Sequence, residues 1–195
     1  MKKWTILTFA ALMILSSCNT NNTEMENRDF MQLAADRYSV RSFESTPVDQ
    51  KTIDQIIRAG QIAPTAVNAQ PQKIYVAKSE SAMAKLNEIS PCIYGAPHCF
   101  IFCYDDTIAA KRGEGDYGTI DATIILTHMM FEAENLGVGT CIVGYFDPAK
   151  LSEAFELPAN IHPVLLMPFG YPSENSVPSE NHTSYRPLEE TVEEI

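Results

Sequence analysis

Two arginines and a serine alternate with other residues in the stretch RYSVRSF, residues 37–43. In an extended chain, side chains two residues apart share a face, so Arg37, Ser39 and Arg41 would point the same way. Two guanidinium groups beside a hydroxyl supply hydrogen-bond donors and positive charge, which suit a phosphate group. The same spacing fits the solvated edge of a strand, and spacing alone does not decide between the two.

A second set of polar side chains lies in the stretch IAPTAVNAQPQ, residues 62–72. Thr65, Asn68 and Gln70 could hydrogen-bond to both the donor and the acceptor edges of a planar ligand. A loop of this composition can also cap itself. Further on, Gly144 follows apolar residues in CIVGYFD, where a backbone could approach a flat ring closely or where a strand simply ends.

Other chemistries find no support in the residue pattern. The sequence contains no C-x-x-C pair, no His/Cys ligand cluster and no convincing nucleophile–histidine–acid set. Cys99 and Cys103 lie in HCFIFCY, a predicted strand, so they would be about 13 Å apart, too far for a disulfide. Cys92 and Cys141 complete the four cysteines after residue 18, and three pairings would be possible if all four were oxidised. We expect buried free thiols.

The rest of the chain predicts the elements that position these residues. A chain of 195 residues, 45% hydrophobic and 20% charged, is typical of one globular domain. Helices are predicted over residues 29–36, within 46–64 after a cap at Asp49, over 79–89, over 116–137 and over 147–155. Strands are predicted over residues 73–78, 98–104, 139–146 and 162–171. This alternation indicates a mixed α/β or α+β domain.

The helix predicted over residues 116–137 is apolar around its whole circumference and ends at Gly137, a residue typical just past a helix terminus. A helix that is apolar all round must be buried all round. In so small a chain it could bury one side at an interface between subunits, or it could be the central helix of a monomer.

The first residues have the pattern of an export signal. Lys2 and Lys3 precede an apolar run too short to span a membrane, and Ser16-Ser17 lead to Cys18. Residues 15–18 resemble a bacterial lipobox, so we expect a signal peptide over 1–17, a lipidated Cys18, a polar tether to residue 28 and one domain over 29–195. The alternative is a plain signal peptide with an incidental cysteine.

Without residues 1–17 the chain has 12 basic and 25 acidic side chains, a formal net charge of −13. Such an acidic surface repels nucleic acid and anionic lipid head groups. We therefore expect no nucleic-acid partner, and contact with a bacterial membrane only through the lipid anchor, on the periplasmic or surface side.

From about residue 29 to its end, the chain resembles the FMN-dependent nitroreductase family. The resembling motifs, in order, are RYSVRSF (37–43), PV (47–48), APTAVNAQP (63–71), the long helix running into LGVG (136–139), VG (143–144), FGYP (169–172) and RPLEE (186–190). Each motif is weak alone, and their shared order carries the resemblance. The resemblance implies an α+β fold with a mixed or antiparallel sheet flanked by helices. It also implies an intertwined homodimer with FMN in clefts at the interface.

The resemblance also implies which residues would bind FMN. The family's FMN-phosphate clasp corresponds to Arg37, Ser39 and Arg41, with Tyr38 beside them, and a second phosphate-side arginine corresponds to Arg186. The loop along the ribityl chain and ring edge corresponds to Pro64, Thr65, Ala66, Asn68 and Gln70, of which Asn68 and Gln70 could come from the other subunit. Val143 and Gly144 correspond to the backbone beside the flavin ring. Two departures are Ser184, where the family often has lysine, and Gln72, where it often has tryptophan.

The implied activity is a ping-pong transfer of electrons from NAD(P)H, or an unknown extracytoplasmic reductant, to nitroaromatic or quinone-like acceptors. No side chain is then an obligatory acid or base, so we assign no catalytic residue. Export would separate the protein from cytoplasmic nicotinamides, and the signal lacks paired arginines. The alternative is therefore a lipid-anchored flavin- or ligand-binding protein with little or no turnover. A third possibility is another flavin reaction, such as reductive dehalogenation, although this short chain leaves little room for a lid.

Overall fold

The computed structural model describes residues 29–195. The expected signal peptide, the lipidation site at Cys18 and the tether up to residue 28 lie outside the described residues. Within the described part of the chain, none of the helices combines the length and the apolar character needed to cross a membrane.

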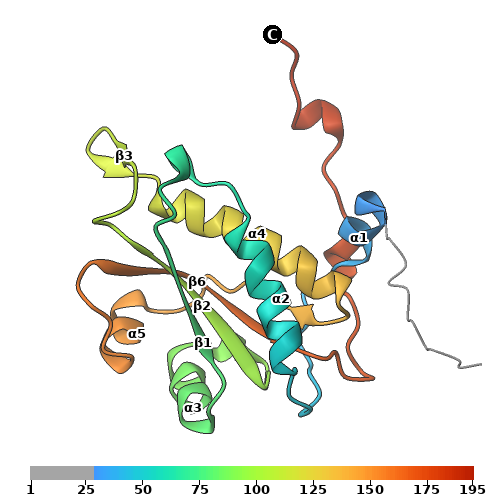
Figure 1. Ribbon diagram of the computed structural model, residues 1–195. Helices are drawn as coiled ribbons and strands as arrows, with labels where there is room; N and C mark the ends of the chain where they lie inside the picture. Colours follow the sequence, from blue (N-terminus) through green and yellow to red (C-terminus); the bar gives the residue numbers. More distant parts are fainter. Residues whose placement is uncertain (1–28) are drawn as a thin grey trace, which may run out of the picture.

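A four-stranded sheet in the order β1-β2-β6-β5 forms the centre of the domain (Figure 1). Its strands are β1 (Gln72–Ala77), β2 (His98–Asp105), β5 (Gly139–Thr140) and β6 (Ile161–Gly170). All of these strand pairs are antiparallel, and the described parallel contact is an isolated bridge between Ser39 and Thr140. A separate small hairpin, β3 (Lys111–Arg112) with β4 (Gly115–Asp116), was not predicted.

Helices cover both faces of the sheet, which confirms the α+β prediction (Figure 1). They are α1 (Phe30–Asp36), α2 (Gln50–Gln61), α3 (Glu80–Ile89), α4 (Gly118–Asn135) and α5 (Pro148–Ala154). Short 3₁₀ turns are η1 (Ala66–Asn68), η2 (Pro91–Ile93), η3 (Glu180–Thr183) and η4 (Leu188–Glu190). The helix predicted within residues 46–64 begins after its expected cap, because the Asp49 carboxylate accepts a hydrogen bond from Thr52 N at 3.0 Å.

The central strand β2 is buried on both sides, as its apolar sequence predicted. Phe100 and Phe102 point into the core formed with α2 and α4, where Phe100 stacks on Phe169 with ring centroids 4.2 Å apart. The alternate residues Cys99, Ile101 and Cys103 point into the core formed with α3 and α5. All four described cysteines are free, and Cys99, Cys103 and Cys141 are buried, as expected.

The strand predicted over residues 139–146 is largely wrong. Only Gly139 and Thr140 pair as a strand, and Val143 makes one isolated bridge to Leu166. Between them Cys141 N donates to the Pro168 carbonyl oxygen at 3.2 Å, and beyond them the chain turns away towards α5. The apolar residues in this segment therefore indicate burial beneath the sheet edge and not a continuous strand.

The C-terminal segment, which we call the arm, begins after residue 173 and extends away from the body of the domain (Figure 1). It is exposed along most of its length, although it carries several large apolar side chains. Those that are exposed are Val177, Tyr185, Leu188, Val192 and Ile195. Apolar residues in this number on an extended arm indicate a segment that packs against another surface.

Candidate functional site

The segment from Arg37 to Arg41 is fixed by pairing with the end of the sheet. Ser39 bridges to Thr140, and Val40 N donates to the Thr140 carbonyl oxygen at 2.9 Å. Val40 is fully buried and so close to Gly139 that a Cβ there would lie 2.6 Å from Val40 Cγ2. Since Val40 faces the core, Ser39 and Arg41 on either side of it face the other way.

Cys141 is the common neighbour of the three clasp residues, Arg37, Ser39 and Arg41. Burial raises the pKa of the Cys141 thiol. The charge of Arg41 and a hydrogen bond with Ser39 lower that pKa, and the charge of Arg37 lowers it further. Ser39 therefore contacts this thiol, and Arg37 and Arg41 lie near enough for their charges to act on it, as expected if the three side chains share a face. The clasp is the name we use for these three residues.

The clasp has an unsatisfied donor. Arg37 Nε is buried and has no hydrogen-bond partner among the described residues. Arg41 is exposed, and its Nη1 reaches only the Ser39 carbonyl oxygen, at 3.5 Å. A buried guanidinium N–H left unpaired is costly, and an anion with several acceptor oxygens would satisfy it. On this ground the residues fit a phosphate group such as that of FMN.

Tyr94 and Cys92 also belong to this neighbourhood, and sequence reasoning missed both. A hydrogen bond with Cys92 and burial raise the pKa of the Tyr94 hydroxyl, whereas a hydrogen bond with Arg41 lowers it. Tyr94 adopts a left-handed conformation (φ 56°), and Gly95 follows at φ 70°. The Tyr-Gly pair after η2 was the available signal, because glycine often marks such a turn.

The loop over residues 64–70 has an unusual backbone. Val67, Asn68 and Gln70 all have positive φ, near 50°, although none is glycine. Such conformations cost on the order of 1–3 kcal/mol each and persist only where the surroundings enforce them. The loop is closed by Gln70 N, which donates to Thr65 Oγ1 at 3.1 Å. Pro64, Asn68 and Gln70 are exposed and accessible to a ligand, and Gln70 Nε2 donates to the Asn68 carbonyl oxygen at 3.5 Å.

The first turn of α4 holds this loop. Ala66 N donates to Asp121 Oδ1 at 2.9 Å, and Asp121 is 1% exposed. Sequence reasoning missed Asp121, because a single carboxylate in an apolar helix gives no sign of what it contacts.

The clasp and the 64–70 loop lie at opposite ends of α4 (Figure 1). The loop is bonded to Asp121 in the first turn, whereas the clasp pairs with Thr140, beyond the helix end at Gly137 (φ 73°). An α-helix of 18 residues is about 27 Å long. The two predicted halves of the site are therefore separated within one chain.

Val143 and Gly144 lie on the clasp side. Val143 is buried, and its backbone exchanges hydrogen bonds with Leu166 at 2.8 and 2.9 Å. Gly144 is exposed and borders a cavity of about 440 Å³. Its lining residues are Ile89, Pro91, Gly144, Tyr145, Phe146 and Asp147. This surface offers open backbone and aromatic side chains beside the clasp.

Two other predicted site residues point elsewhere in this chain. The Tyr38 hydroxyl donates to Ser176 Oγ at 3.1 Å, so Tyr38 contacts the C-terminal segment. Arg186 lies on the exposed arm, where its Nε donates to Glu190 Oε2 at 3.2 Å. No described contact joins either side chain to Arg37, Ser39 or Arg41, and their roles in binding stay predictions.

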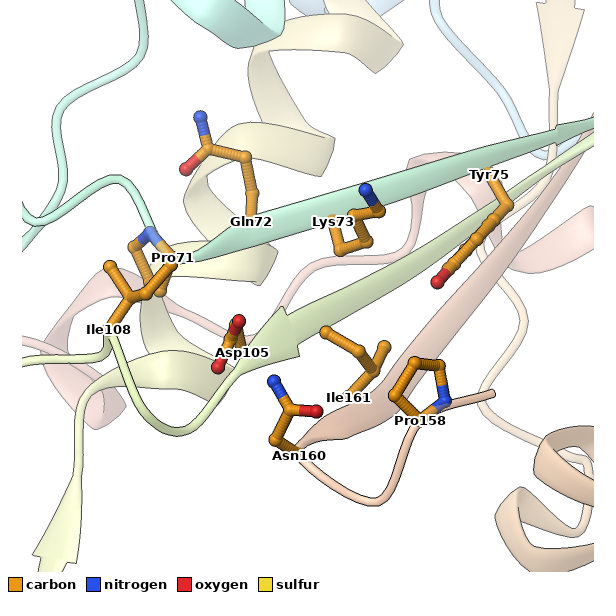
Figure 2. A pocket seen from close by; sticks show the side chains of 9 residues that line it. All are labelled: Pro71, Gln72, Lys73, Tyr75, Asp105, Ile108, Pro158, Asn160 and Ile161. Atoms are coloured by element: carbon orange, nitrogen blue, oxygen red, sulfur yellow. The ribbon is translucent and has the colours of Figure 1, made fainter. Parts of the chain in front are cut away.

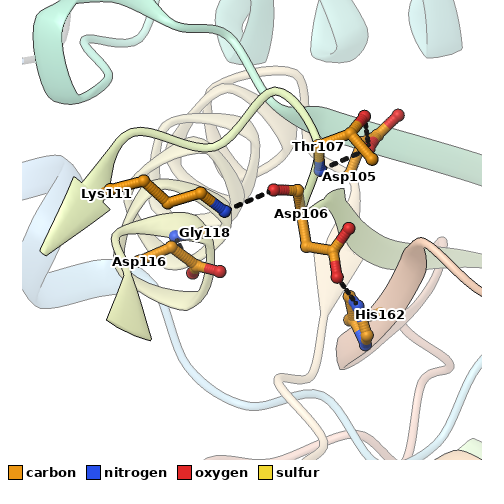
Figure 3. A network of polar contacts seen from close by, with 7 residues as sticks. All are labelled: Asp105, Asp106, Thr107, Lys111, Asp116, Gly118 and His162. Carbon is orange, nitrogen blue, oxygen red and sulfur yellow. Dashed lines mark hydrogen bonds and ion pairs between the residues drawn. The ribbon is translucent and has the colours of Figure 1, made fainter. Parts of the chain in front are cut away.

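A further cavity, of about 590 Å³, lies at the edge of the sheet where β1 and β6 begin and β2 ends, and it is lined by Pro71 and Gln72, directly after the 64–70 loop (Figure 2). Its carboxylate, Asp105, accepts hydrogen bonds from Thr107 and Asn160, which lower its pKa. Beside it, His162 contacts Asp106 at 2.8 Å and Lys111 donates to the Asp106 carbonyl oxygen (Figure 3). The Lys111 contact ties the start of the β3–β4 hairpin to the end of β2, and the Asp105 and Asp106 carboxylates are already paired.

Comparison with known proteins agrees with this architecture. The model of the nitroreductase family matches residues 34–92 and 89–171. An FMN reductase [NAD(P)H] of Bacillus subtilis is 32% identical over 161 residues, which cover 72% of this chain and 65% of the relative. The chain thus spans less than two thirds of that relative's length.

Solved structures share the fold. A nitroreductase family protein of Clostridium difficile is 32% identical, with a TM-score of 0.80 over 85% of this chain and 98% of the other. A protein of Exiguobacterium sibiricum, solved in complex with FMN, has a TM-score of 0.77 over 86% of this chain and 98% of its own, at 18% identity. From the matched residues and the shared fold, this chain belongs to the nitroreductase family.

Proposed function

We propose that this protein is an FMN-dependent oxidoreductase. It takes electrons from NAD(P)H, or from another reductant, and passes them in a ping-pong cycle to nitroaromatic or quinone-like acceptors. Membership in the nitroreductase family supports this activity, as does similarity to a relative named for FMN reduction with NAD(P)H.

The observation that carries the proposal is the unpaired, buried Arg37 Nε beside Ser39 and Arg41. Leaving a buried donor unpaired is costly, and the FMN phosphate would supply both the negative charge and the acceptor oxygens that the cluster lacks. The thiol of Cys141 lies among the same side chains, and its raised pKa keeps it neutral, so it does not compete with the phosphate for the arginines.

The two halves of the site come together in a homodimer. Because the clasp and the 64–70 loop lie at opposite ends of α4, one flavin meets both only if a second copy supplies the loop. A groove of about 560 Å³ between α1, α2 and α4 supports such an interface. It is lined by Phe30, Leu33, Ala59, Ile62, Thr127, His128, Phe131, Glu132 and Asn135. The apolar arm after residue 173 would pack on the partner.

Bound FMN would supply the hydride chemistry, and the chain's own residues would position it. Arg37, Ser39 and Arg41 would hold the phosphate through charged hydrogen bonds. The Asn68 and Gln70 amides of the partner copy would hydrogen-bond polar atoms of the flavin. The exposed Gly144 backbone would allow the cofactor to approach closely.

A second candidate is a lipid-anchored flavin-binding protein with little or no turnover. The signal-like residues 1–18 favour it, because export to the periplasmic or surface side would remove the protein from cytoplasmic NAD(P)H. Both candidates use the same clasp, so they differ in turnover rather than in binding.

The test begins with purified residues 19–195, whose visible absorption spectrum is recorded before and after adding FMN and desalting. The oxidoreductase is supported if the protein retains flavin, if NADH, NADPH or dithionite reduces that flavin, and if a quinone then reoxidises it. Retained flavin that bleaches but does not turn over supports the binding protein. A colourless protein that does not bind added FMN contradicts both candidate functions.

A further inference from the structure

Asp121 is a carboxylate buried in the apolar helix α4. Its side chain is 1% exposed, and Oδ2 has no hydrogen-bond partner among the described residues. Burying a carboxylate costs several kcal/mol unless other groups compensate it, and this one receives a single described hydrogen bond, from Ala66 N. Its position in the first turn of α4 gives it some help from the helix dipole. A residue this costly is better explained by what it holds in place than by the stability of the core.

What it holds is the strained 64–70 loop. The Ala66 amide that Asp121 binds immediately precedes Val67 and Asn68, which have φ of 48° and 56°. Val67 is β-branched and 89% exposed, so neither its own preference nor its packing enforces a left-handed conformation. The remaining restraints lie within the loop itself, such as the hydrogen bond from Gln70 N to Thr65. The described hydrogen bond that ties the loop backbone to a helix is therefore the one to Asp121.

We propose that Asp121 is a positioning residue for the flavin, which presets the 64–70 loop before the cofactor arrives. The inference rests on the proposed function, since this loop carries Asn68 and Gln70. A preset loop loses little conformational freedom when the flavin binds. The entropic cost of ordering the loop therefore does not reduce the affinity that the Asn68 and Gln70 amides contribute. In the proposed dimer the loop serves the clasp of the other copy, so Asp121 acts across the interface.

The test compares three variants of residues 19–195. D121A removes the acceptor, D121N keeps a carbonyl oxygen able to accept from Ala66 N, and T123A truncates an exposed residue of the same helix as a control. FMN affinity is measured by quenching of flavin fluorescence, and amide hydrogen exchange over residues 64–70 is followed without flavin. Thermal melting of each apo protein reports stability separately.

We expect D121A to weaken FMN binding about tenfold or more, the worth of a hydrogen bond to a charged group, and to speed exchange at Ala66 and its neighbours. D121N should stay within about threefold of the parent, because the restored acceptor rescues the loop, and T123A should match the parent. D121A that melts lower but binds FMN with unchanged affinity would show a merely structural residue and overturn the proposal.

Two further outcomes are distinguishable. If the parent protein binds no FMN, the proposed function fails, and the role of Asp121 in flavin binding fails with it. If D121A does not fold, Ala66→Pro removes the same hydrogen bond from the loop side, at the first position of η1, where proline is tolerated. FMN affinity in A66P equal to that of the parent would then overturn the proposal.

Discussion

Ser39 and Asn68 lie beyond opposite ends of α4 in one chain, the first paired with Thr140 and the second in the loop bonded to Asp121. Both are assigned to one flavin, so we expect residues 19–195 to be dimeric in solution by sedimentation equilibrium. Deleting residues 185–195 should weaken the dimer, because it removes the exposed Tyr185, Leu188 and Val192. A stable, folded monomer that retains FMN would contradict the shared site.

Arg37→Ala should weaken FMN binding by about 1.5–3 kcal/mol, because it removes a charged donor from the phosphate. Arg58→Ala is the matched control, since Arg58 lies exposed on α2 and bonds only to Gln61 in the described chain. Flavin titration of both variants checks the prediction. Equal affinity in the two variants would mean that the phosphate does not bind at Arg37.

Gly118→Ala should destabilise the domain by about 1–3 kcal/mol, since an added Cβ would overlap the half-buried Tyr104 ring that packs on the start of α4. Gly115 offers a control three residues earlier, where the nearest atom to a new Cβ is the Arg112 carbonyl oxygen at 3.8 Å. Urea unfolding of the two variants measures the difference. A G118A protein as stable as G115A would show that the ring can move aside.

Stability should fall as the pH drops from about 7.5 to about 5.5, because burial and the charge of Lys78 lower the pKa of His98 below its ordinary value of 6.5. In this pH range His98 binds a proton in the unfolded chain but stays neutral in the folded chain. This contribution is complete above about pH 6.5 and is lost below it. Thermal melting across this range should show a flatter profile for His98→Asn than for the parent protein, and an equally steep profile in the variant would contradict the prediction.

Thiol reagents should label Cys92 before the other described cysteines. Cys92 is half-buried, whereas Cys99 and Cys103 are fully buried, and burial raises the pKa of Cys103 to about 12. Mass spectrometry of the folded protein after brief alkylation checks the order. Because Cys92 contacts Tyr94 near the clasp, we also expect bound FMN to slow its labelling. Labelling that starts at Cys103 would contradict the packing of β2.

Local patterns predicted most of the elements and part of the site. Alternation predicted that Arg37, Ser39 and Arg41 share a face, and the cap at Asp49 and the end of α4 at Gly137 followed from residue type. The apolar run over residues 139–146 led to a wrong strand prediction. A segment buried under a sheet edge and a segment paired as a strand have the same apolar sequence pattern.

Long-range contacts were beyond such patterns. Cys141, Tyr94 and Asp121 join the site through residues some 50 to 100 positions away, and periodicity identifies a buried face without identifying its neighbour. The left-handed Val67 contradicts its own intrinsic preference, so only the surroundings could reveal it.

The separation of clasp and loop along α4 also has a genetic consequence. In a symmetric dimer each cleft would combine the clasp of one copy with the loop of the other. A chain with a damaged clasp and a chain with a damaged loop would each be inactive alone. If the two kinds of chain associate at random, about half of the dimers contain one chain of each kind. Each of these mixed dimers has one intact cleft and one damaged cleft, so about a quarter of all clefts would be active. Two null alleles of this gene would then complement each other.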